Sequence, residues 1–207
     1  MLISPVTIEY CRIGAFFDPG ADMRIYYPNL QAIEQQTMQL DHAQCKYCRQ
    51  THQLVSHGFI RKKRVGADPQ AVGKRVFCSN RHHRTGCGRT MQLYLDSTIR
   101  YLHHAGCCVA ALVLSLMAGT TIQYAYHQAT GTGTPRNAYR WLHRLRMQAS
   151  AFRSVPHRPP LQDAGPFAAA IRPARLALLT SAFKMLLQRF EQPLCASYQS
   201  QLQRSFL

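Results

Sequence analysis

Acidic side chains are scarce in this sequence. Nine aspartates and glutamates stand against 25 lysines and arginines among 207 residues, which leaves a formal net charge of +16 and a pI near 10.0. A balance of this sign is typical of proteins whose partners are polyanions. Nucleic acid is therefore the first candidate partner, and an anionic membrane surface is the second.

Long hydrophobic runs and an export signal are also lacking. The longest apolar stretch, GCCVAALVLSLMAG at 106–119, is too short to cross a bilayer and suits a buried helix. The first residues have no basic n-region, and Glu9 interrupts the only early apolar run. We therefore expect a cytoplasmic, nucleoid-associated protein that does not enter membranes, in which a CxxC pair binds metal or is redox-active instead of forming a structural disulfide.

The basic charge is concentrated in one part of the chain. Residues 1–44 carry two basic and five acidic side chains, whereas residues 45–100 carry twelve basic and two acidic ones. Proline-rich sequence follows at 154–166. The excess of basic charge thus begins where the cysteines begin, which suggests that the two features serve one function.

Four cysteines have a spacing that predicts a zinc site. Cys45 and Cys48 form CKYC, and a two-residue gap lets a tight turn direct both thiolates to one ion. Cys78 and Cys87 are separated by eight residues, so their loop must return Cys87 to the metal. Glycines on either side of Cys87 make that return sterically easy.

Other assignments of these residues remain open. His82 or His83 could replace one of the second pair of cysteines, since imidazole also binds zinc. The CKYC pair could instead be a redox pair, although no thioredoxin-like strand and helix follow it. The remaining cysteines after the ribbon are expected to be small core residues. These are Cys107, Cys108 and Cys195.

Basic side chains surround the predicted metal site. Crowded cations beside a dication are tolerable only in water or against phosphate, so we expect these residues to contact nucleic acid. The residues are Arg61, Lys62, Lys63, Arg64, Arg81, Arg84 and Arg89.

A second basic stretch, TPRNAYRWLHRL, has helical periodicity. Thr134 is expected to cap the helix and Pro135 to occupy its first turn, with apolar residues recurring at 138, 141, 142 and 145. The other faces carry side chains that can read base edges in the major groove. The predicted DNA-binding residues here are Thr134, Arg136, Asn137, Arg140 and Arg144. An ordinary solvated basic helix, or one that contacts RNA or protein, is the alternative.

The periodicity as a whole predicts an α+β protein, with a small β zinc ribbon followed by a helical helix-turn-helix bundle. Strands are expected within 3–17, 51–60, 74–78 and 89–95, and helices over 29–40, 99–118, 121–129, 135–152 and 172–190. The corresponding segments are an N-terminal strand and helix segment (1–44), the ribbon (45–98), the helix-turn-helix module (99–153), a proline-rich linker (154–171) and a C-terminal helical segment (172–207).

Two of these motifs resemble a known family. CKYC followed by KRVFCSNRHHRTGCGRTMQLYL resembles the zinc ribbon of insertion-sequence transposase proteins, and TPRNAYRWLHRL resembles their helix-turn-helix recognition helix. The resemblance implies zinc and double-stranded DNA as cofactor and partner. An acidic-triad transposase needs three carboxylates for its metal ions, but only Asp163 and Glu191 follow the helical module. We therefore expect no enzymatic activity in this chain.

The expected function is a zinc-stabilised, sequence-specific DNA-binding protein that is an accessory or regulatory component of a mobile genetic element. A homodimer, or a complex with a transposase or recombinase, is compatible with this role. The alternatives are an RNA-binding zinc-ribbon protein, in which Phe59, Phe77 and Tyr94 stack on bases, and a transcriptional regulator unrelated to transposition.

Overall fold

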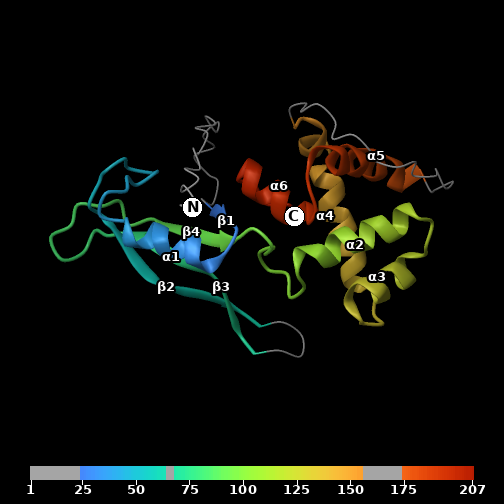
Figure 1. The fold of residues 1–207 in the computed structure, drawn as a ribbon, viewed down its shortest axis with the longest axis horizontal. Coiled ribbons are helices and arrows are strands. Elements are labelled where there is room, and N and C mark those ends of the chain that lie inside the picture. Colours follow the sequence, from blue (N-terminus) through green and yellow to red (C-terminus); the bar gives the residue numbers. More distant parts are fainter. Residues whose placement is uncertain (1–23, 64–67, 156–173) are drawn as a thin grey trace, which may run out of the picture.

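The computed structural model describes residues 24–63, 68–155 and 174–207. These residues form a sheet lobe, made of strands β1–β4 and helix α1, and a helical lobe, made of helices α2–α6. Figure 1 shows the two lobes side by side along the long axis of the molecule. The predicted α+β class is confirmed.

Within the described ranges the sheet has four strands, in the order β1-β4-β3-β2. β2 (Leu54–Lys62), β3 (Gln70–Cys78) and β4 (Thr90–Leu95) pair in an antiparallel manner and correspond to three of the predicted strands. β1 (Arg24–Tyr27) pairs parallel to β4 and was not predicted. The strands expected within 3–17 lie outside the described residues.

Helix α1 (Leu30–Met38) covers one face of this sheet. It begins after Asn29, whose side-chain oxygen accepts a hydrogen bond of 2.8 Å from the backbone N–H of Ala32 and so caps the helix. Ile33 is fully buried against Val76 and Leu93, in a core that also contains Cys45 and Cys78. The thiols therefore lie at the edge of a hydrophobic cluster and not on an isolated loop.

The helical lobe contains five helices among the described residues. α2 (Gly106–Met117), α3 (Ile122–Thr130) and α4 (Arg136–Arg153) correspond to the three helices expected before the linker, and α5 (Ala174–Arg189) to the one after it. The helix expected from residue 99 begins only at Gly106, because residues 99–105 are irregular and Tyr101 has a φ of +61°. α6 (Leu194–Leu202) was not predicted.

One hydrophobic core holds the five helices together. It includes Trp141 on α4, Tyr126 on α3 and Phe183 on α5. The Tyr126 and Trp141 rings meet edge to face with their centroids 5.3 Å apart, which fixes how α3 and α4 cross. The residues of α4 expected on its inner face, at 138, 141, 142 and 145, are all buried, as predicted.

Thr134 does not cap α4, and this prediction was wrong. Pro135 occupies the position before the first helical residue, and no side chain of the described residues caps the helix start. The hydroxyl of Thr134 is therefore not used by the first turn. Proline has no side-chain oxygen that could accept from the first N–H groups of the helix.

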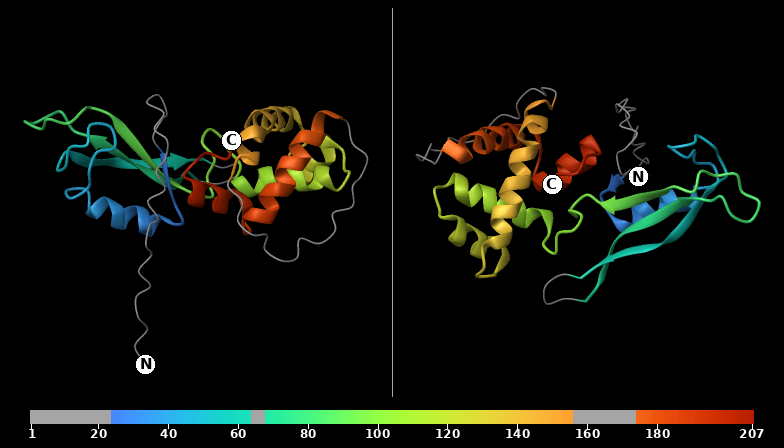
Figure 2. Two further views of the ribbon diagram at one scale, coloured as in Figure 1. Left: turned by 90° about the horizontal axis from the view of Figure 1, so that it is seen from above. Right: turned by 180° about the vertical axis from the view of Figure 1, so that it is seen from behind.

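Two glutamines of the C-terminal segment join the lobes. Gln199 on α6 is fully buried, and its amide nitrogen donates to the backbone carbonyls of Asp96 (2.6 Å) and Thr98 (3.0 Å) just after β4. Gln203 accepts from the N–H of Tyr26 (2.8 Å) and donates to its carbonyl (3.1 Å). Figure 2 shows α6 next to β1 in both views. The Gln203 amide thus occupies the open edge of β1 as a further strand would.

Candidate metal centre and basic faces

The first pair of thiols is held by a tight turn before β2. The N–H of Arg49 donates to the carbonyl of Cys45 at 2.7 Å, and the N–H of Cys45 donates to the carbonyl of Gln50 at 2.9 Å. This closes the CKYC segment into a loop, as the spacing of Cys45 and Cys48 predicts. Both thiols consequently project from the same side of the turn.

The second pair is held by the long loop between β3 and β4. The N–H of Cys78 donates to the carbonyl of Arg89, and the N–H of Gly88 donates to the carbonyl of Cys78, both at 2.9 Å. Gly88 has a φ of +72°, and a side chain on Gly86 would lie 2.7 Å from the Cys78 sulfur. A side chain would clash at Gly86 and would be strained at Gly88, which supports the predicted role of the glycines beside Cys87.

The four sulfurs converge on one point. The Sγ atoms of Cys45 and Cys87 are 3.8 Å apart, those of Cys48 and Cys78 are 3.6 Å apart, and all four lie within 4.8 Å of one another. Tetrahedral zinc with bonds of about 2.3 Å separates its sulfur ligands by about 3.8 Å. The cluster therefore has the size that a tetrahedral thiolate site requires, and it could hold a metal ion.

The electrostatic environment of the thiols points to the same use. A hydrogen bond from the Gln50 backbone is the main cause that lowers the pKa of Cys48 to about 7. Burial raises the pKa of Cys78 to about 12, and it also raises that of Cys87. Without a cation, burial disfavours several adjacent thiolates. A bound dication would supply the compensating charge, and its binding would release protons.

Neither histidine of the loop joins this cluster. His82 and His83 are exposed, with φ values of 52° and 64°, and the metal-capable group found among the described residues contains cysteine alone. Cys195 is buried and Cys108 is partly buried, as expected for core residues. Cys107 is exposed, so its predicted core position was wrong, because it lies on the outer face of α2.

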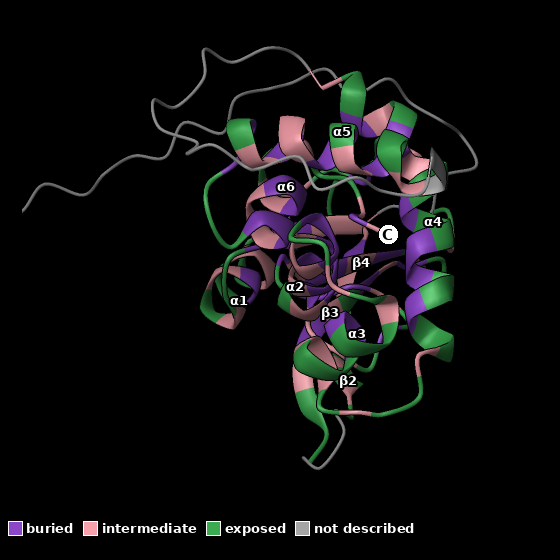
Figure 3. Ribbon diagram, turned by 90° about the vertical axis from the view of Figure 1, so that its right-hand side faces the viewer, coloured by how far each residue is buried: buried purple, intermediate pink, exposed green. Residues whose placement is uncertain are grey.

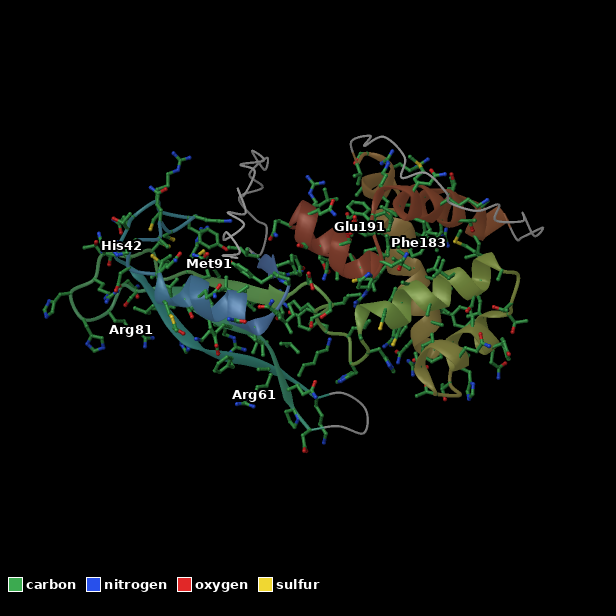
Figure 4. All side chains as sticks on the ribbon, in the orientation of Figure 1. His42, Arg61, Arg81, Met91, Phe183 and Glu191 are labelled. Atoms are coloured by element: carbon green, nitrogen blue, oxygen red, sulfur yellow. The ribbon has the colours of Figure 1, made fainter. Side chains whose placement is uncertain are left out.

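The predicted basic residues of the sheet lobe differ in exposure and in contacts. Arg61, Lys63, Arg81 and Arg89 are exposed, whereas Arg64 lies outside the described residues. Figure 4 shows Arg61 on β2 and Arg81 at the far end of the lobe. Several of these residues also contact the protein itself. Lys62 donates to the carbonyl of Ile99 (2.8 Å), Arg84 donates to that of His52 (2.9 Å), and the guanidinium of Arg89 lies 4.8 Å from the ring centre of Tyr47.

The predicted residues of α4 share one outward surface. The side chains of Arg136, Asn137, Arg140 and Arg144 are exposed, and Thr134 is exposed just before them. Figure 3 shows α4 with its buried stripe turned inward and its exposed stripe turned to solvent. The structure thus presents these groups together on the solvent side of α4.

Comparisons with protein-family models, curated proteins and solved structures return no match for this chain. The class of this protein is therefore defined by its fold and site alone. It is a mixed α+β protein with a four-cysteine centre that could hold a metal ion. No helix in the described ranges is both long and apolar enough to cross a bilayer.

Sequence reasoning missed two features that position the site. One is the pair of glutamines that joins the lobes, and the other is the sheet face opposite α1, on which Arg75 is exposed. The alternation of polar and apolar residues in β3 and β4 contained the signal for that face. The glutamines left no comparable signal, because their partners are more than 100 residues away.

Proposed function

We propose that this protein is a zinc-stabilised DNA-binding protein that contacts duplex DNA with the outward surface of α4 and with the basic loop beside the cysteine cluster. The observation that carries the proposal is the convergence of Cys45, Cys48, Cys78 and Cys87 at tetrahedral spacing. Four sulfur ligands close the coordination sphere, which is typical of structural zinc and leaves no open position for catalysis.

The surface of α4 supports the DNA-binding part of the proposal. Arginine can donate two hydrogen bonds to guanine, and asparagine can pair with adenine. Arg136, Asn137 and Arg140 are exposed at the start of a helix whose inner face is locked by Trp141. A rigid helix with such an outer face fits the major groove, and α2 and α3 precede it as in a three-helix reader.

The resemblance of the ribbon and of α4 to insertion-sequence proteins gives the biological setting that we propose. In that setting the chain would be an accessory or regulatory subunit of a mobile element, and catalysis would belong to another chain. A transcriptional regulator without a link to transposition would use the same two surfaces. The two settings differ in the DNA sequence that is bound and not in the chemistry of binding.

Metal content and duplex affinity together test this proposal. Purified protein should contain one zinc per chain, and Cys48→Ser should lose it, because three thiolates hold zinc far less tightly than four. Cys107→Ser is the matched control, since its thiol is exposed and belongs to no cluster found among the described residues. Zinc retained in full by Cys48→Ser would contradict the assignment.

Duplex affinity is measured by anisotropy of a labelled DNA. Arg140→Ala should weaken binding by about tenfold, the effect of losing one bidentate base contact. Raising the salt from about 50 to about 200 mM should weaken wild-type binding by about a thousandfold or more if six or more phosphates are contacted. Arg153→Ala, an exposed arginine at the other end of α4, is the control. Affinity that ignores both the substitution and the salt would refute DNA binding by α4.

A further inference from the structure

The sheet lobe has a second face, opposite α1, that the metal centre and α4 do not use. Val76 and Leu93 point towards Ile33 of α1 in the core of the lobe. Because neighbouring residues of a strand point to opposite faces, Arg75, Phe77, Gln92 and Tyr94 lie on the other side. The view from behind in Figure 2 looks onto that side.

Cross-strand pairing arranges this face in rows. Phe77 on β3 pairs with Thr90 on β4, and in the next row Arg75 pairs with Gln92. The Gln92 side-chain oxygen is buried and has no hydrogen-bond partner among the described residues. The side chain of Arg75 is exposed beside it. The group that this row presents to solvent is therefore the Arg75 guanidinium.

Aromatic rings alternate with cations along the same face. The Arg81 guanidinium lies 5.9 Å from the ring centre of Phe77, and the His57 ring meets Phe77 edge to face at 6.2 Å. At the other end, Tyr101 is 75% exposed, with the Arg100 guanidinium 4.4 Å from its ring centre.

Tyr94 lies on the same face as Phe77 and is buried in a cluster with Tyr26 and Val72. The segment that carries Tyr101 is held at the end of β2, because Lys62 donates to the carbonyl of Ile99 at 2.8 Å and the His103 Nδ1 lies 3.3 Å from the carbonyl oxygen of Lys63. Tyr101 therefore lies beside the end of the sheet. The strip runs from Arg81 through Phe77 and Arg75 to Tyr101.

We propose that this strip, from Arg81 to Tyr101, binds single-stranded nucleic acid. Flat rings can stack on unpaired bases while guanidinium groups contact the phosphates between them, and a paired duplex offers no open base faces to such a surface. The charge of the strip complements a polyanion. The inference goes beyond the proposed function, because it concerns an unpaired strand and, apart from Arg81, residues that the duplex-binding surfaces do not use.

The test uses the full chain and fluorescently labelled strands of about 12 nucleotides, within the usual site size for stacking platforms. Oligothymidylate, oligouridylate and a mixed-sequence duplex are compared by anisotropy. Tyr101→Ala, and Phe77→Leu, which keeps an apolar side chain in place, should each weaken single-strand binding by about tenfold and leave duplex binding unchanged. Arg75→Gln should make the logarithmic salt dependence shallower by about 0.7.

Two variants control for indirect effects. Met38→Ala removes an 83% exposed side chain from α1 on the covered side of the sheet and should change nothing. Arg140→Ala should weaken duplex binding only. Equal losses in Met38→Ala and Tyr101→Ala, or unchanged single-strand affinity in both Tyr101→Ala and Phe77→Leu, would overturn the inference.

The two labelled single strands and the labelled duplex separate this inference from the proposed function. Binding to the duplex but to neither single strand refutes the inference and leaves the proposed function standing. Binding to single strands alone supports the inference and refutes duplex recognition by α4. A preference for oligouridylate over oligothymidylate would identify RNA as the natural source of the strand, and the reverse preference would identify DNA.

Discussion

His104 lies where the two lobes meet, in the irregular segment before α2. Its ring contacts Trp141 edge to face, with centroids 5.4 Å apart, and Tyr126 with centroids 6.4 Å apart. Burial lowers the pKa of this imidazole, and the nearby charges of His103 and Lys62 lower it further. The folded protein therefore favours neutral His104, as expected for a ring packed against two aromatic side chains.

This lowered pKa predicts a loss of stability in mild acid. As pH falls below about 6.5, the unfolded chain takes up a proton on this residue before the folded chain does. The contribution of His104 is therefore complete above that value and is lost as pH falls towards the lower folded pKa. His104→Phe keeps the ring contacts but cannot titrate, so its stability relative to wild type should rise between about pH 7.5 and about pH 5.5.

Urea unfolding at the two pH values measures this difference. His143→Phe is the matched control, because His143 is exposed on α4. A stability difference between His104→Phe and wild type that does not change with pH would contradict the prediction.

At the scale of elements, the start of α2 packs directly against α6. A side chain on Gly106 would overlap the Cys195 sulfur and would lie 2.9 Å from the Cys195 Cβ. Cys195 is 2% exposed, and burial raises its pKa to about 12, so its thiol stays neutral and behaves as an apolar group. The close approach of these two helices thus depends on a glycine facing a small side chain.

Gly106→Ala should accordingly destabilise the protein by about 1–3 kcal/mol through overpacking. Cys195→Ala in the same chain removes the sulfur that the new methyl group meets, so the double variant should recover part of the loss. Urea unfolding of the two single variants and the double variant gives the coupling between the positions. Strictly additive effects would show that the two residues do not compete for the same space.

Helix α4 shows how much of an element its own sequence can determine. Its apolar residues recur at helical spacing, and all of those predicted to face inward are buried. The start of the helix was predicted less well. Thr134 can cap α4 only if it occupies the position directly before the first helical residue, and Pro135 occupies that position. α6 was not predicted because its polar and apolar residues are only weakly separated onto opposite faces of the helix, so its local sequence has little helical periodicity.

At the scale of the whole molecule, the two lobes have separate hydrophobic cores. The core of the sheet lobe includes Cys45 and Cys78 themselves, whereas the helical core surrounds the single tryptophan of the chain, Trp141, which is 3% exposed. The hydrogen bonds of Gln199 and Gln203, with that of Lys62 to Ile99, connect the lobes. Loss of the proposed metal ion should therefore destabilise the core of the sheet lobe before the helical core.

Chelation offers a test of this division. Treatment with EDTA should loosen the sheet lobe, because small metal-bound cores depend on the binding free energy of the ion. Trp141 fluorescence should stay native. Hydrogen exchange in peptides from β2–β4 and Trp141 fluorescence report the two lobes separately, and added zinc should restore the protection. Simultaneous loss of both signals would show that the molecule unfolds as one unit.

The sequence by itself determined the class of the fold, the four thiols and the basic outward surface of α4. Each of these follows from local spacing: two residues between Cys45 and Cys48, alternation in β3 and β4, and helical periodicity in α4. The tertiary structure alone decided that β1 pairs parallel to β4 and that Gln203 completes the β1 edge. These contacts join residues up to 177 positions apart, and their free energy depends on the whole chain having folded, so no local pattern can encode them.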